Sequence, residues 1–135
     1  MSASFTATKS GVYRAPGSVG VLRAQAEKVG CLWVELSLAE AGDKKQFFAA
    51  CKKALKLPSY FGGNWDALAD CLRDLNWLKS KGYVLHLAGA AQFAKAAGDD
   101  YQTALDVLGE AAEFWQGRDT PFVVLVDGAA KLKSF

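Results

Sequence analysis

The stretch FVVLV, Phe122–Val126, decides the fold class, because its five residues are all apolar. A strand with one face in water alternates apolar and polar residues. An unbroken apolar run that follows a proline is instead typical of a strand covered on both faces, as in a parallel sheet. The sequence therefore predicts that this run is a strand with structure packed on each side of it.

Two further strands are predicted upstream of this run. Residues 31–38 (CLWVELSL) alternate, so that their leucines and Val34 share one face, and residues 83–88 (YVLHLA) form a compact segment between two glycines. Helical patterns separate the three segments, and strands joined through helices pair in parallel with right-handed crossovers. The predicted fold class is therefore α/β, with a three-stranded parallel sheet flanked by helices.

Helical periodicity predicts helices over residues 18–28, 43–56, 90–97 and 100–116, and one more that begins after Asn64. Ser18, Asp43 and Asn64 are the expected N-caps, and Gly30 is expected to end the first helix. Residues 1–16 look like a loose start with at most a short edge strand near Gly11–Arg14. Residues 1–30 are therefore predicted to be an N-terminal extension, packed on or preceding a main domain of residues 31–135.

Composition restricts the class of protein. The chain has 135 residues, and 51% are hydrophobic, which is enough for one domain with a core. No apolar run approaches the roughly 18 residues of a membrane helix, and the N-terminus lacks the apolar segment of a secretory signal. We expect a cytoplasmic protein without membrane contact. Because Cys31, Cys51 and Cys71 form no metal-binding pattern, we expect no metal site and no cofactor.

Charge is divided along the chain. Residues 1–56 carry nine Lys and Arg against four Asp and Glu, a net charge of +5, whereas residues 57–135 carry seven against ten, a net charge of −3. The lysines of residues 43–56 are most simply a solvated helix face, although binding of RNA through this face is an alternative hypothesis.

The helix after Asn64 has an unusual acidic face. Asp66, Asp70 and Asp74 follow one another at intervals of four residues, opposite an apolar stripe that contains Trp65. Like charges at this spacing cost a helix roughly 0.2–0.5 kcal/mol per pair. Two explanations remain open from the residues alone: a solvated face, or a row of carboxylates presented to a cationic site.

This segment resembles the signature of the barstar family, the intracellular inhibitors of barnase-type ribonucleases. The residues that carry the resemblance are Leu57, Pro58, Tyr60, Phe61, Gly62, Asn64, Asp66, Ala67, Leu68, Asp70, Cys71 and Leu72. The order of strands and helices around it also matches, over about residues 31–127, so that the main domain is expected to be barstar-like.

The resemblance implies a binding mechanism. Tyr60 would be the aromatic residue that packs against the catalytic base of the enzyme, and Asp66 and Asp70 would take the places of substrate phosphates. Gly62 and Asn64 would shape the loop that carries Tyr60. The partner would be a toxin-like or secreted ribonuclease, bound as a protein, with no direct contact to nucleic acid.

The sequence departs from the family pattern at several places. Ala69 stands where the family's namesake has a tryptophan, and Asp74 has no counterpart, so Asp74 is predicted to be solvated surface. A further carboxylate of the family comes from the last helix, where Glu110 is the first candidate and Glu113 the second.

The fold is also compatible with an interaction protein, or with an immunity protein for a toxin that is not a ribonuclease. A hydrolase built on Cys71 and His86 lacks a third group to orient the histidine, so we expect no enzyme activity.

Overall fold

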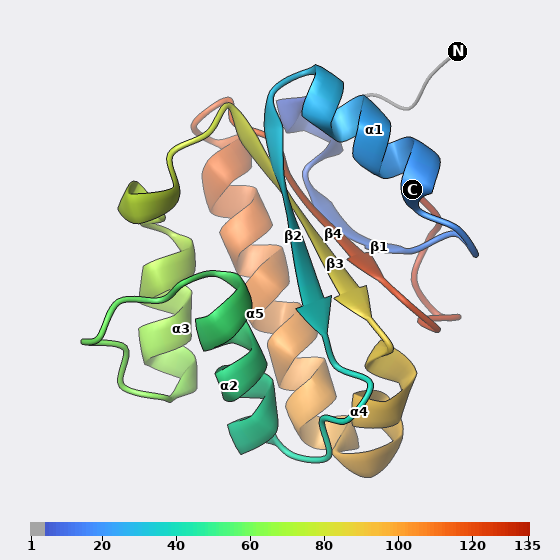
Figure 1. Cartoon of the computed structure of the whole chain (residues 1–135), viewed down its shortest axis with the longest axis vertical. Coiled ribbons are helices and arrows are strands. Elements are labelled where there is room, and N and C mark those ends of the chain that lie inside the picture. Colours follow the sequence, from blue (N-terminus) through green and yellow to red (C-terminus); the bar gives the residue numbers. More distant parts are fainter. Residues whose placement is uncertain (1–4) are drawn as a thin grey trace.

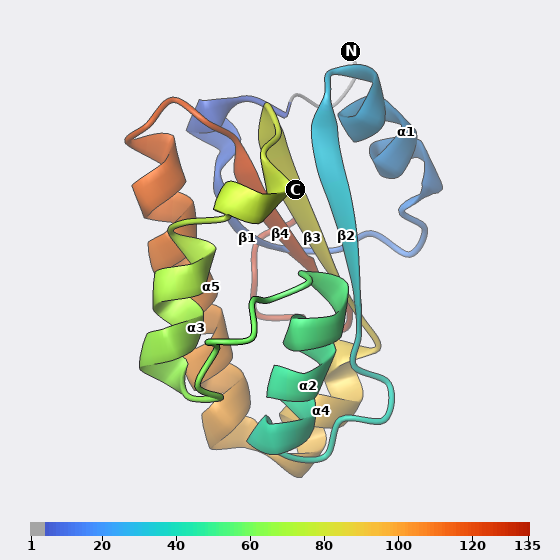
Figure 2. The ribbon, with the colours of Figure 1, turned by 60° about the vertical axis from the view of Figure 1, so that its left-hand side comes forward.

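The computed structural model describes residues 5–135, which form helices on both faces of a parallel sheet (Figures 1 and 2). The sheet has the strand order β1-β4-β3-β2, and its strands are β1 (Gly11–Arg14), β2 (Cys31–Ser37), β3 (Gly82–Ala88) and β4 (Phe122–Val126). All five residues of β4 are buried, because β1 and β3 flank this strand and helices cover both of its faces. The prediction from the apolar run is confirmed.

The sheet has four strands, so the prediction of three was wrong. β1 pairs in parallel with β4, with Gly11 opposite Val123 and Arg14 opposite Val126. The fourth strand is the possible edge strand expected near Gly11–Arg14, and it does lie at the edge of the sheet. It was not counted in the predicted sheet, because four residues are too few for their periodicity to distinguish a strand from a loop. Its position depends on a partner more than a hundred residues away, which a local pattern does not reveal.

Five α-helices surround the sheet: α1 (Gly20–Lys28), α2 (Lys44–Ala54), α3 (Trp65–Leu72), α4 (Ala90–Ala96) and α5 (Gly98–Gln116). Two short 3-10 turns, η1 (Ala7–Lys9) and η2 (Asn76–Leu78), complete the described elements. Figure 2 shows α2, α3 and α5 on one side of the sheet and α1 on the other. None of the helices within residues 5–135 is long and apolar enough to span a membrane.

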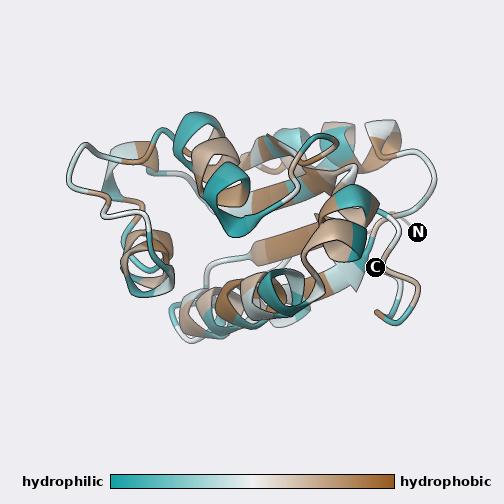
Figure 3. Cartoon of the chain, turned by 90° about the horizontal axis from the view of Figure 1, so that it is seen from below, coloured by the Kyte–Doolittle hydropathy of each residue, from teal (hydrophilic) through white to brown (hydrophobic). Residues whose placement is uncertain are grey.

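Alternation along the strands divides the interior into two cores. The larger core lies between the sheet and α2, α3 and α5, and includes Leu36, Leu85 and Val124. The smaller core lies under α1 and includes Trp33 and Val84. In Figure 3 the strands at the centre are hydrophobic, while the surrounding helices mix hydrophobic and hydrophilic residues, as expected for helices with one buried face.

The helix boundaries confirm most of the predicted caps. Asp43 and Asn64 each accept a hydrogen bond of 2.8 Å from the backbone N–H three residues further on. Gly30 ends α1 with a φ of +86°, a conformation that glycine adopts without strain. Ser18 does not cap α1, because the helix begins one residue later, after Val19, whose side chain has no capping oxygen.

The described part of the N-terminal extension contributes directly to the fold. Residues 5–30 supply β1 to the sheet and α1 to the smaller core, where Phe5 and Ala26 are buried. The backbone N–H of Arg14 donates to the carbonyl of Lys133 over 2.8 Å, so the C-terminal residues lie against the end of β1. A domain boundary near residue 30 stays a prediction.

Candidate functional site: the loop before α3 and the face of α3

Aromatic rings attach the loop between α2 and α3 to the larger core. The ring of Phe61 meets that of Phe48 on α2 edge to face, with centroids 6.0 Å apart. Trp65, the first residue of α3, packs on the same Phe48 ring at 4.7 Å and on Phe47 at 5.7 Å. The segment that follows Tyr60 is therefore fixed to one helix at both of its ends by ring packing.

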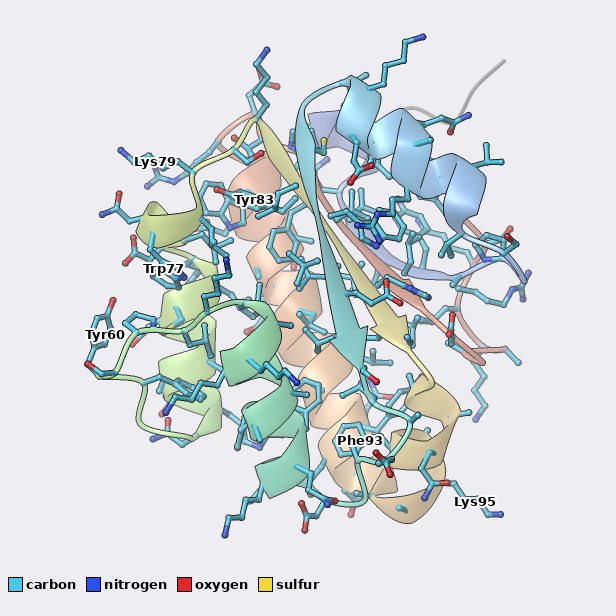
Figure 4. The ribbon with its side chains drawn as sticks, in the orientation of Figure 1. Tyr60, Trp77, Lys79, Tyr83, Phe93 and Lys95 are labelled. Atoms are coloured by element: carbon cyan, nitrogen blue, oxygen red, sulfur yellow. The ribbon has the colours of Figure 1, made fainter. Side chains whose placement is uncertain are left out.

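The backbone of the loop then turns Tyr60 outward. A turn closes where the N–H of Phe61 donates to the carbonyl of Pro58 over 2.9 Å. Gly63 has a φ of +69°, whereas Gly62 needs no unusual backbone angle, so Gly63 is the glycine that the turn requires. Tyr60 is 70% exposed and projects away from the body of the protein (Figure 4).

Two tryptophans hold the ends of the helices that frame the loop. The indole N–H of Trp115 on α5 donates to the carbonyl of Leu72 at the end of α3 over 2.7 Å. The indole N–H of Trp77, which follows α3 (Figure 4), donates to the carbonyl of Leu55 at the end of α2 over 2.9 Å. These bonds satisfy carbonyl groups that helix ends leave free. Their partners lie 43 and 22 residues away, so no local pattern indicates them.

The aspartate row lies on the exposed face of α3 and its end, as periodicity predicted, because Leu68 and Leu72 on the opposite face are buried. Asp66 is in the first turn, where the helix dipole favours a carboxylate. Asp70 is 77% exposed and forms an ion pair of 2.9 Å with Arg73. An exposed pair of this kind contributes little to stability, so it leaves Asp70 open to another cation.

The structure brings Tyr60 and Asp70 together around a hollow of about 200 Å³, and it places Asp74 there as well. Partial desolvation and then the charge of Asp74 raise the pKa of the Tyr60 phenol. Burial raises the pKa of the Cys71 thiol at the same hollow, with smaller contributions from Asp74 and Asp70. Asp74 therefore lines the same hollow as Tyr60 and Asp70, although the family resemblance gives it no counterpart.

The other predicted site residues lie around this hollow or away from it. Asp66 is exposed but does not line the hollow, and Ala69 is half-buried against the larger core. The side chain of Asn64 is used as the helix cap. Glu110 and Glu113 line a different groove, of about 890 Å³, between α5 and the C-terminal residues, so the structure does not bring them to the hollow.

The proposed pair of Cys71 and His86 does not form, because these side chains lie on opposite faces of the sheet. His86 is buried beside Trp33, with Nδ1 2.9 Å from a carboxylate oxygen of Glu35 and Nε2 2.8 Å from one of Asp127. Burial lowers the pKa of His86, but the bonds to the two carboxylates outweigh it and raise the pKa. Within residues 5–135, no three His, Cys, Asp or Glu side chains are placed to hold a metal ion.

Comparison with known proteins agrees with the resemblance in the sequence. A model of the family described as Barstar (barnase inhibitor) matches residues 32–127, which is most of the chain and includes the loop, α3 and the three strands β2, β3 and β4. No curated protein matches the chain. The match extends well beyond the aspartate motif and spans the larger core, and on this basis the chain belongs to the Barstar family, whose members are described as barnase inhibitors.

Proposed function

We propose that the chain inhibits a barnase-type ribonuclease by covering its active site with the loop before α3 and the face of α3. The observation that carries this proposal is the exposed Tyr60 beside a hollow bounded by Asp70 and Asp74, in a chain of the Barstar family. The inhibitor would act in the cytoplasm, before a toxic ribonuclease is released.

The chemistry of the target supports this assignment. An enzyme that cleaves RNA holds phosphate groups with Arg, Lys and His side chains, and carboxylates on a rigid helix reproduce the charge of those phosphates. Asp66 and Asp70 are separated by about 6 Å along the helix axis, from four residues at 1.5 Å each. Asp70 would exchange Arg73 for a cation of the enzyme, while the ring of Tyr60 covers the catalytic base.

The loop is prepared for binding before the enzyme arrives. Its flanking rings pack on Phe48, and the indoles of Trp77 and Trp115 fix the helix ends. Because little of this surface must become ordered on binding, more of the contact energy remains as affinity. Gly62 and Asn64 belong to the proposal as loop-shaping residues, Ala69 as a small central contact, and Glu110 as a contact at the edge.

An RNA-cleavage assay tests the proposal, with barnase and the ribonucleases secreted by the source organism as targets. The wild-type chain should suppress cleavage by at least one of them. Asp70→Lys should raise the inhibitory concentration by on the order of 100-fold or more, mainly through faster dissociation. Glu40→Lys, the same charge change at an exposed site in the loop after β2 and outside the hollow and both grooves, serves as the matched control and should have little effect.

Two results would contradict the proposal. Equal inhibition by the wild type and Asp70→Lys would remove the site from α3. Capture of a protein that is not a ribonuclease, with no inhibition of any ribonuclease tested, would favour an immunity or interaction function for another target.

A further inference from the structure

A second, basic groove lies on the other side of the proposed binding loop. It has a volume of about 410 Å³ and is formed between α2 and residues 61–63. Lys44, Lys45 and Lys52 of α2 surround it, and Phe48 and Phe61 contribute to its apolar floor. The volume is within the range of about 300–1,000 Å³ in which proteins bind small groups.

Phe61 is the boundary between the two sites. It lines the acidic hollow together with Tyr60 and Asp70, and it also lines the basic groove together with Lys44. The loop therefore separates two depressions of opposite charge that share one residue. A protein that covers Tyr60 and Asp70 and extends across Phe61 would reach the basic groove.

Helix stability does not account for two of these lysines, whereas Lys52 lies in the last turn of α2, where the helix dipole favours a cation. Lys44 and Lys45 are the first two residues of α2, where the positive end of the helix dipole disfavours a cation by about 0.3–1 kcal/mol. Among residues 5–135, no ion pair involves Lys44, Lys45 or Lys52. Three ammonium groups thus surround an apolar floor, and none of them forms an ion pair within the described residues.

We propose that this groove is a second contact region for the same partner, and that it takes an apolar side chain flanked by carboxylates on the partner's surface. The identity of the partner as a ribonuclease rests on the proposed function, whereas the chemistry of the groove does not. The partner would carry an acidic and apolar patch beside its cationic active site.

The observations favour a protein segment over RNA. An RNA backbone repeats its negative charge along its length, and a strand that continued past the groove would meet Asp70 and Asp74 across Phe61. A protein segment can instead place isolated carboxylates against the lysines and an apolar side chain against the apolar floor of the groove.

Opposite charges on the two sides of one loop also define how a partner binds. A ribonuclease with a cationic active site but no acidic patch would place its own cations against Lys44, Lys45 and Lys52. Like charges opposed across an interface disfavour such a partner, so the groove would select among ribonucleases with similar active sites.

Amide NMR titration of the full chain tests the groove without a ribonuclease. The probes are a short blocked peptide with leucine between paired glutamates, the same peptide with lysines in place of the glutamates, and oligouridylate. The acidic peptide should shift the amide signals of residues 44–52 and 61–63, and the basic peptide should not. The triple variant Lys44→Glu, Lys45→Glu, Lys52→Glu should weaken binding of the acidic peptide by on the order of 10-fold.

A matched triple variant, Lys28→Glu, Lys79→Glu, Lys95→Glu, changes the net charge equally at exposed positions outside the groove. It should retain binding of the acidic peptide, and thermal unfolding should show that both triple variants are folded. No shifts with the acidic peptide, or equal weakening by both triple variants, would overturn the proposal. Tighter binding of oligouridylate at the same amides would assign the groove to RNA instead.

The ribonuclease that the wild type inhibits provides the second readout. The groove variant should bind it more weakly than the matched variant does, and equal affinities would overturn the role of the groove in this interface. Because the peptide titration contains no enzyme, failure of the groove and failure of ribonuclease inhibition are distinguished.

Discussion

The two faces of the sheet are stabilised by different chemistry. On the face that carries α2, α3 and α5, apolar side chains and aromatic rings fill the interior. On the face that carries α1, the core is smaller and ends in a polar cluster, in which His86 lies between Glu35 and Asp127. Ring packing positions the proposed binding loop, whereas hydrogen bonds connect the strands that support it.

The polar cluster connects three neighbouring strands. Glu35 comes from β2, His86 from β3, and Asp127 follows β4. Trp33 donates its indole N–H to Glu35 over 3.0 Å, and the N–H of Gly89 donates to Asp127 over 3.1 Å. Because both ring nitrogens of His86 are paired in this way, burying this polar side chain costs the fold little free energy. The two faces should therefore respond differently to substitution.

The largest effect is expected from Phe47→Ala on the face with the ring packing. Phe47 is fully buried, stacked on Phe93 at 5.1 Å and packed against Trp65 at the start of α3. Loss of the ring leaves a cavity and should lower the free energy of unfolding by about 3–5 kcal/mol, measured by urea denaturation. Phe47→Leu, the control, retains most of the volume and should cost clearly less. Equal losses would show that ring packing is not what positions α3.

The next effect is expected from His86→Gln on the other face. Glutamine cannot bond both carboxylates as an imidazolium does, so we expect a loss of about 1–3 kcal/mol in the free energy of unfolding. The proposed ribonuclease inhibition should be retained in the folded variant, because the loop lies on the opposite face. A larger loss of inhibition than of stability would contradict this separation.

The same residue predicts the pH dependence of stability. The pKa of His86 is raised above its ordinary value of 6.5 by the bonds to Asp127 and Glu35, against the opposing effect of burial. Its contribution is complete below about pH 6.5 and is lost as the pH rises through the pKa of the folded state. The free energy of unfolding should therefore differ most between the wild type and His86→Gln at acidic pH, and this difference should decrease at alkaline pH. If this difference in the free energy of unfolding did not change with pH, ion pairing of a protonated His86 with Glu35 and Asp127 would be contradicted.

How far the sequence predicts the molecule also differs between the faces. The caps at Asp43 and Asn64, and the apolar side of α3, follow from residues within one or two turns, and they were predicted. The polar cluster was not, because the partners of His86 lie 51 and 41 residues away. β1 likewise depends on pairing with a distant strand.

The candidate site shows the same limit. The sequence predicts the exposed aspartate face from its period, and the resemblance to the family indicates Tyr60 within the loop. The sequence does not predict that Asp74 shares a hollow with Tyr60, because this contact depends on how the loop folds back along α3. Nor does it predict that Trp115 holds the end of α3, since that bond joins residues of two separate helices.

A smaller effect is expected from Gly30→Ala, at the junction of α1 and β2. Gly30 has a φ of +86°, and an added Cβ would come within 2.9 Å of the Lys81 side chain. The lysine chain is flexible, so the backbone conformation determines the loss, about 1–2 kcal/mol by thermal or urea unfolding. Gly98→Ala, where an added Cβ meets nothing within 4 Å and φ is not positive, is the control and should cost less. A greater loss at Gly98 would contradict this account.

The smallest effect on stability is expected from Arg73→Ala on the face that carries the binding loop. The pair of Arg73 and Asp70 is exposed, so its removal should change the free energy of unfolding by less than about 1 kcal/mol. It also removes a positive charge from the aspartate row, which should raise the association rate with a ribonuclease and make that rate more sensitive to salt. Stopped-flow association at low and high salt measures both, with Arg23→Ala, in an exposed ion pair on α1, as the matched control. If the two variants associate equally fast, the charge of the row does not guide binding, and the contact geometry of the loop alone must account for recognition.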